Sequence, residues 1–276
     1  MTSPSALFAI PPQPRNVLEI NALLDKPGAN TARIADLIGK DPSLTAQVLK
    51  TANSPGFSRG RATDSVFQAL QVMGLRNFKA IILKCALRQV FSQTKNAFLE
   101  EFWRHSELIA QCCAVVARSR APEFAHGAYL AGLFHDCAIP LMTQRFGDYK
   151  DFIGGGFRNE DNFIQEEERR YSINHCALSY LFAKAWSLPA PICLAIHHHH
   201  DESLPNPPDS ASARTMTAIV MTSHYVINRF DVSGRGDETP VNPEEWTKSR
   251  GDIAALLGLL PDDLYDFEEE LFIEAA

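Results

Sequence analysis

The residues of this sequence that could do chemistry are histidines on apolar helix faces. All nine histidines fall between His105 and His224, and the first 104 residues contain none. In five predicted helices a histidine extends a stripe of apolar residues at i+3 or i+4 spacing, which places an imidazole near the buried side of the helix. The positions concerned are His105, His135, His175, His199 with its neighbour His200, and His224.

Two acidic residues accompany these histidines. Glu101 stands four residues before His105 and shares its helix face, and Asp136 follows His135 directly. One buried imidazole is usually satisfied by a single hydrogen bond, but five separate burials would each need a polar partner. A shared divalent transition metal would satisfy them together, because neutral imidazole and carboxylate are good ligands for Zn, Fe, Mn or Ni. An aspartate can also bridge two cations about 3.5–4 Å apart, so His135-Asp136 is compatible with one ion or two.

The run of four histidines at 197–200 spans more than one helix face. We therefore expect only its last two members to point at a common centre. His197 and His198 are expected at the surface, and so is His126, which fits no apolar stripe.

The elements that must position these side chains are predicted to be helices throughout, since strand alternation is scarce. Helix starts stand at Asn30 and at Asp41-Pro42, and Gly39 and Gly74 end helices. Further helices are predicted at 77–91, 97–118, 124–134, 165–185, 192–200, 216–229 and 250–273, with connections at 147–162, 201–213 and 231–249. The predicted fold class is all-α, with two packed helical lobes.

Three parts follow from this pattern: an N-terminal helical lobe (1–96), a second helical lobe with the candidate metal site (97–230) and an acidic C-terminal helical extension (231–276). The charge is divided accordingly, with a net +6 over residues 1–104 and −13 over residues 105–276. Such an uneven charge predicts parts with different surfaces.

The composition excludes several classes of protein. The 276 residues are 45% hydrophobic and 21% charged, as in an ordinary globular chain, which excludes disordered and fibrous classes. The six cysteines show no CxxC pair and are predicted to be reduced, buried thiols. The first residues lack the pattern of a secretory signal, and no apolar run is long enough to span a membrane, so we expect a cytoplasmic location.

The order of the motifs resembles the HDOD family, the HD-related output domains of bacterial signalling proteins, over roughly residues 14–230. In the first lobe the family's helix start resembles Asp41-Pro42-Ser43-Leu44, its following turn Asn53-Ser54, and a later segment Ala69 to Gly74. In the second lobe the matching motifs are Trp103-x-His105-Ser106, Ala131 to Asp136, His175, Trp186-x-Leu188-Pro189 and His199-His200.

The resemblance extends to the parent HD superfamily of metal-dependent phosphohydrolases, and it implies that the second lobe is an HD-like helical bundle. By that resemblance Glu101, His105, His135, Asp136, His175, His199 and His200 occupy ligand-like positions, and His224 aligns with a late aspartate of HD enzymes. Ile139 stands where the related HD-GYP enzymes carry a lysine, and an apolar side chain cannot bind a phosphate charge. No Gly-Tyr-Pro element follows His200. These departures argue against cyclic-dinucleotide hydrolysis.

Three functions compete at this point. The first is a signalling module that binds a signalling protein or a small phosphorylated or nucleotide ligand. The second is a phosphohydrolase, in which Asp136 and His135 are the central catalytic residues of a metal-activated water attack on phosphorus. The third is nucleic-acid binding through Arg76, Lys84 and Arg88, which recur at multiples of four. A solvated helix face explains that basic row better, so nucleic acid is not an expected partner.

Overall fold

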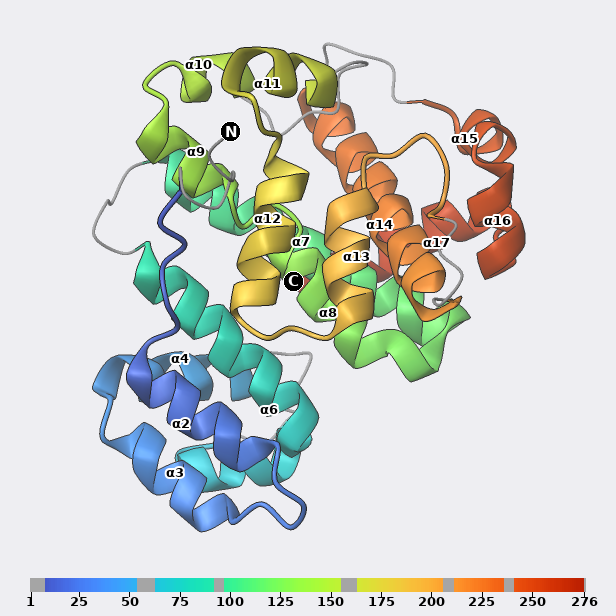
Figure 1. The fold of residues 1–276 in the computed structure, drawn as a ribbon. Helices are drawn as coiled ribbons and strands as arrows, with labels where there is room; N and C mark the ends of the chain where they lie inside the picture. Colours follow the sequence, from blue (N-terminus) through green and yellow to red (C-terminus); the bar gives the residue numbers. More distant parts are fainter. Residues whose placement is uncertain are drawn as a thin grey trace. The chain divides into compact units, whose positions relative to one another are not determined.

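The computed structural model describes residues 8–53, 63–91, 97–154, 163–205, 211–235 and 241–275, with the side chains of 76, 230–235 and 272–275 left undescribed. Within these ranges every regular element is a helix (Figure 1), which confirms the all-α prediction. The chain divides into two compact units. One comprises Met1–Ile10 with Asn96–Ile273, and the other Pro11–Lys95 with Glu274–Ala276.

The unit of Pro11–Lys95 is a small bundle whose helix starts are encoded locally. Its helices are α2 (Arg15–Leu24), α3 (Thr31–Gly39), α4 (Pro42–Ala52) and α6 (Val66–Val90). The Asn30 side chain accepts a hydrogen bond from the Arg33 N–H at 3.1 Å, and Asp41 accepts from the Leu44 N–H at 3.0 Å. These are N-cap contacts, as the sequence predicts.

Helix α6 is two helical stretches joined by a kink at Gly74. The φ of Gly74 is +73°, in the region that only glycine adopts without strain, so the glycine ends the first stretch, as the sequence predicts, and a second stretch follows it. Of the other motifs predicted for this lobe, Ser54 and the Arg76 side chain lie outside the described residues.

The larger unit is built on five helices that pack against one another: α7 (Ala97–Arg120), α8 (Ala125–Phe134), α12 (His175–Ala185), α13 (Ala190–His198) and α14 (Ala211–Arg235). Helix α7 packs along α8 and α14, and α13 lies between α12 and α14 (Figure 1). Shorter helices surround this bundle: η1 (Pro122–Phe124), α9 (Ile139–Arg145), α10 (Tyr149–Ile153), α11 (Phe163–Tyr171), α15 (Pro243–Ser249), α16 (Gly251–Leu257) and α17 (Pro261–Ala275).

Gly132 sets the close approach of α8 to α7. A Cβ added at this residue would lie 2.8 Å from the Ala110 Cα and 2.8 Å from the Cys113 Sγ, where backbone cannot easily retreat. We expect Gly132→Ala to lower the free energy of unfolding by about 1–3 kcal/mol, because the two helices must separate. Denaturant titration measures this, with Gly147→Ala as the control, since a Cβ there meets nothing within 4 Å. A Gly132→Ala protein as stable as the wild type would contradict the described packing.

Several predicted segments differ from the structure, among them the connections at 147–162, which contains α10, and at 201–213, where α14 begins at Ala211. The continuous helix predicted over 165–185 is interrupted: Ser172 has a φ of +59°, and the Asn174 side chain accepts a hydrogen bond from the Ala177 N–H at 2.7 Å, which starts α12 anew. The connection predicted over 231–249 is partly helical, because α14 runs to Arg235 and α15 begins at Pro243 with Asn242 as its cap.

The predicted C-terminal extension has its described helices in the same compact unit as α7 and α14. The Tyr225 and Trp246 rings stack with centroids 4.7 Å apart, and an ion pair of 3.2 Å joins Arg118 to Glu270. Among the helices that the structure describes, none has both the length and the apolar character needed to cross a bilayer.

Candidate metal centre

The five main helices of the larger unit each bring a histidine to one place. His105 lies within α7 and His224 within α14, while His135 and Asp136 directly follow α8. His175 is the first residue of α12, and His199 and His200 directly follow α13. The cluster therefore combines residues from within α7 and α14 with residues at the ends of α8, α12 and α13. Each of these side chains is buried except that of His200, which is half-buried.

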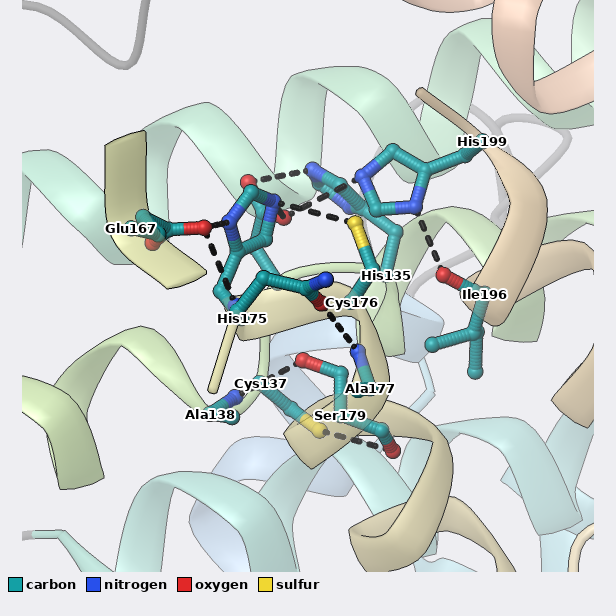
Figure 2. A network of polar contacts seen from close by, with 12 residues as sticks. His135, Cys137, Ala138, Glu167, His175, Cys176, Ala177, Ser179, Ile196 and His199 are labelled. Atoms are coloured by element: carbon teal, nitrogen blue, oxygen red, sulfur yellow. Dashed lines mark hydrogen bonds and ion pairs between the residues drawn. The ribbon is translucent and has the colours of Figure 1, made fainter. Parts of the chain in front are cut away.

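The Asp136 carboxylate is the shared contact of three imidazoles. The Nε2 atom of His135 lies 2.8 Å from Asp136 Oδ2, and the Nε2 atoms of His175 and His199 lie 3.3 and 3.4 Å from Asp136 Oδ1. Figure 2 shows the His135, His175 and His199 rings, which come from different segments of the chain, close to one another. One carboxylate therefore receives three ring nitrogens from segments far apart in the sequence.

In His135 and His199 the Nδ1 atom, which is the ring nitrogen away from Asp136, donates a hydrogen bond to a backbone carbonyl oxygen. The Nδ1 of His135 lies 2.6 Å from the Gly132 carbonyl oxygen, and the Nδ1 of His199 lies 2.7 Å from the Ile196 carbonyl oxygen. A carbonyl oxygen can only accept, so each Nδ1 carries a hydrogen and donates it. In the neutral ring Nε2 then presents a lone pair to the Asp136 carboxylate. Two lone pairs at this distance repel each other unless a proton or a metal cation lies between them.

Several buried polar atoms of the cluster make no hydrogen bond with any described residue. They are His135 Nε2, Asp136 Oδ1, His199 Nε2, and both ring nitrogens of His224. The His224 ring is 4% exposed and lies edge-on to His135, with centroids 4.6 Å apart. Buried polar atoms without a partner are costly and rare in proteins, so their concentration here indicates a missing common partner.

Burial keeps one set of these imidazoles neutral. Burial, reinforced by the neighbouring His135, lowers the pKa of His105 to about 4. Burial also lowers the pKa of His200 and of His224 well below the usual value, with His199 and His135 respectively adding to the effect. At neutral pH these three rings carry lone pairs, which is the form that binds metals.

A second set is held in the charged form by its anionic neighbours. Burial opposes a charge on His199, but Cys176 and Asp136 outweigh it and raise the pKa of His199 to about 10. Burial likewise opposes a charge on His175, and Cys176 with Glu167 and Asp136 raises its pKa well above the usual value. In the metal-free protein, protons on these two rings therefore occupy the space next to Asp136.

A buried carboxylate orients His175 from behind. Glu167 Oε2 accepts hydrogen bonds from the His175 Nδ1–H at 2.7 Å and from the His175 backbone N–H at 3.1 Å (Figure 2). Glu167 Oε1 accepts a hydrogen bond from the Tyr149 hydroxyl. Glu167 is completely buried. A carboxylate that fixes the outer nitrogen of a histidine is the usual support of a metal-ligating imidazole.

Ser179 holds the segment after Asp136 against α12. Its hydroxyl accepts a hydrogen bond from the Ala138 N–H at 3.1 Å, and the Cys137 thiol lies 3.9 Å from its carbonyl oxygen (Figure 2). These contacts fix the backbone that carries the His135-Asp136 pair.

Three overlapping groups of donor atoms are close enough to hold an ion, with all atoms in each group within 4.8 Å of one another. The structure thus brings together seven of the eight residues predicted as ligands. The groups are His175-Cys176-His199-His200, His135-His199-His224 and His105-His135-Asp136. The cluster could hold a metal ion.

Glu101 is the predicted ligand that lies outside these groups. Its carboxylate pairs with Arg104 at 2.9 Å, and the side chain is 41% exposed. The helix face it shares with His105 reaches solvent one turn before the cluster. The structure therefore gives Glu101 a surface ion pair rather than a place among the converging donors.

The other three histidines lie outside the cluster, and two residues of the cluster were not predicted from the sequence. His126 is exposed as predicted, while His197 and His198 are half-buried, and His198 lies 2.7 Å from Asp201. Cys176 and Glu167 were not predicted as part of the site. The position of Cys176 directly after His175 is the signal that could have identified it, whereas Glu167 lies on a helix of its own, in a highly charged segment.

The HDOD domain family matches residues 10–202, which is more than half of the 276-residue chain. The chain belongs to the HDOD family. The match includes the His135-Asp136 pair and extends just past His200, whereas His224 lies beyond it.

Solved structures similar to this HDOD chain share its fold, and a curated relative matches part of the sequence. An HDOD domain protein of unknown function from Geobacter sulfurreducens is 26% identical, with a TM-score of 0.74, 98% of this chain covered and 92% of that chain. A protein from Shewanella amazonensis SB2B, described as a candidate metal-dependent phosphohydrolase, is 19% identical, with a TM-score of 0.62 and coverage of 98% and 93%. An uncharacterized protein of Treponema pallidum (strain Nichols) is 22% identical over 203 residues. That match covers 72% of this chain but 39% of the Treponema protein.

Proposed function

We propose that this HDOD chain is a regulatory signalling module that carries a divalent transition-metal centre. The proposed ligands are His105, His135, Asp136, His175, His199, His200 and His224. The observation that supports the centre is the buried convergence of three Nε2 atoms on the Asp136 carboxylate, next to a His224 ring with two unpartnered nitrogens. A cation placed among these atoms would be a common partner for the buried ring nitrogens and carboxylate oxygens.

The donor set favours Fe, Mn, Ni or Zn, because imidazole and carboxylate suit these ions. Two of the donor groups share His135, and two share His199. A ring nitrogen has one lone pair, so two groups that share a histidine could not both be filled through that nitrogen. Asp136 offers two oxygens, so its carboxylate would be the residue able to serve one ion or two.

Two features favour a regulatory role: the burial of Asp136 and the apolar residue Ile139 close to it in the sequence. The Asp136 side chain is 5% exposed, and Ile139, three residues later, is an apolar residue at 3%. Neither feature offers a place for a phosphate group. The proposed ligands come from five helices. A bound metal would therefore link α7, α8, α12, α13 and α14 and stabilise their packing. Metal binding then controls how stably the five helices pack. A signalling protein or a small phosphorylated or nucleotide ligand would bind the metal-loaded bundle in preference to the metal-free one.

The second candidate function is a metal-dependent phosphohydrolase. It is favoured by the likeness in fold to the Shewanella protein and by the retained His135-Asp136 pair. When bound, a metal pair supplies a water of lowered pKa and a positive charge for phosphate oxygens. In that case Asp136 and His135 are the central residues, and Glu167 keeps His175 in the required orientation.

Metal content tests both candidates, and turnover separates them. Elemental analysis of the purified protein is expected to find stoichiometric transition metal, and removal by a chelator is expected to lower the melting temperature, with recovery on refilling. A panel of phosphomonoesters, nucleotides and cyclic dinucleotides with added Mn, Fe or Ni is expected to show no turnover above an Asp136→Asn control. Turnover well above that control would favour the phosphohydrolase, and a folded protein that takes up no metal would contradict both.

Metal binding is expected to tighten as the pH rises from about 6 to about 8. In the metal-free protein the raised pKa values of His175 and His199, the latter about 10, keep both rings protonated across this range. The metal must displace these protons, so each one displaced lowers Kd about tenfold per pH unit. Calorimetric titration in two buffers of different ionisation enthalpy counts the protons released. An affinity that does not change with pH would contradict this assignment.

A further inference from the structure

We propose that Cys176 binds a metal through its sulfur, which makes one part of the centre a mixed nitrogen and sulfur subsite. The subsite would consist of Cys176 with His175, His199 and His200. This inference rests on the proposed metal centre and adds the chemical class of ion that this part of it selects.

The geometry places the Cys176 sulfur among imidazole nitrogens. Cys176 is the second residue of α12 and is 3% exposed. Its Sγ lies 3.4 Å from His175 Nε2, and the four candidate donor atoms all lie within 4.8 Å of one another. Figure 2 shows the sulfur directed into the space between the His175 and His199 rings. His199 Nε2, at the edge of this space, is buried and makes no hydrogen bond with the described residues.

Two other buried thiols of the same unit show the contrast. The Cys193 Sγ lies 3.4 Å from the Leu188 carbonyl oxygen, and the Cys137 Sγ lies 3.9 Å from the Ser179 carbonyl oxygen. Each can donate its S–H to the backbone, which is the ordinary arrangement of a structural cysteine. Cys176 instead faces ring nitrogens that would themselves be ligands.

The two ends of the cluster therefore differ in ligand softness. The group of His105, His135 and Asp136 offers nitrogen and oxygen, whereas the group around Cys176 adds a thiolate. A thiolate favours thiophilic ions such as Zn²⁺, Co²⁺ or Cd²⁺ over Mn²⁺ or Mg²⁺. On binding, the sulfur donates an electron pair to the metal as a thiolate, and the proton held by the thiol or by the adjacent His175 ring passes to solvent; no change of oxidation state is required.

Cobalt substitution tests this inference. The full chain is stripped with a chelator and refilled with Co²⁺ without oxygen, since thiolate-bound Co²⁺ gives a near-ultraviolet charge-transfer band that imidazole ligands do not give. We expect this band in the wild type and its loss in Cys176→Ser, with the visible cobalt bands retained. Cys193→Ser is the matched control, because it also exchanges a buried thiol for a hydroxyl, and it is expected to keep the charge-transfer band.

The outcomes separate the subsite from the centre. Cobalt that binds to the wild type without a charge-transfer band, or a band that persists in Cys176→Ser, overturns the role of Cys176 and leaves the histidine and aspartate centre in place. A folded wild type that binds no cobalt overturns the proposed centre itself. Circular dichroism of each variant confirms folding. Should Cys176→Ser not fold, Cys176→Ala replaces it, with the same expected loss of the band.

Discussion

An Asp136→Asn variant is expected to lose its metal while keeping its helical fold. The oxygens of Asp136 lie within 3.4 Å of three imidazole Nε2 atoms. The substitution keeps the shape but removes the negative charge and replaces one acceptor oxygen with a donor. Because loss of a supporting residue alone costs 10–100-fold in metal affinity, loss of this shared ligand is expected to raise Kd by at least about 100-fold. Elemental analysis after dialysis and a competition titration with a metal-binding dye measure the change.

The control for this variant is Asp201→Asn. Asp201 also lies beside a histidine, since its Oδ2 is 2.7 Å from His198 Nδ1, but this pair is at the surface and outside the three donor groups. Its metal content is expected to match the wild type. Equal metal loss in both variants, or full metal retention in Asp136→Asn, would be incompatible with the proposed role of Asp136.

Replacement of Glu167 by glutamine is expected to have the largest effect on stability. The completely buried carboxylate accepts three hydrogen bonds: one from the Tyr149 hydroxyl, one from the His175 backbone N–H and one from His175 Nδ1–H. Glutamine has one acceptor oxygen, so its amide nitrogen would face a donor in the interior. We expect a loss of about 2–5 kcal/mol in the free energy of unfolding. Metal affinity is expected to fall about 10–100-fold as His175 loses its orientation.

The adjacent residue supplies a matched control. Glu166→Gln changes the same atoms one position earlier, where the carboxylate pairs with Arg169 and Arg170 at the surface. Surface ion pairs contribute little to stability, so this variant is expected to unfold with the wild type and to keep its metal. Denaturant titration and metal analysis of both variants make the comparison. If the two variants behave alike, Glu167 does not position His175.

The sequence predicts the imidazoles of this site better than their supports. His105, His135, His175, His199 and His224 each continue an apolar stripe, and a stripe reports which side of a helix is buried. The same spacing rule fails for Glu101, because a helix face that is buried at one turn can reach solvent at the next. The Glu101 side chain at that turn pairs with Arg104 instead of entering the interior.

Contacts between distant segments explain what the sequence does not show. Glu167 lies in a helix dominated by charged residues, and nothing in its spacing distinguishes it from the half-buried Glu166. Its burial depends on Tyr149 and His175, which belong to other helices. Local signals are more dependable: the caps at Asn30 and Asp41 act within one turn, and Gly74 bends the chain at the predicted position.

The most direct test of the proposed centre is anomalous X-ray diffraction from crystals of the purified protein at the absorption edge of the metal that elemental analysis finds. The account predicts an anomalous peak between the Asp136 carboxylate and the Nε2 atoms of His135, His175 and His199. A well-ordered crystal structure with no peak at this position, after incubation of the protein with Mn, Fe, Ni and Zn, would contradict it.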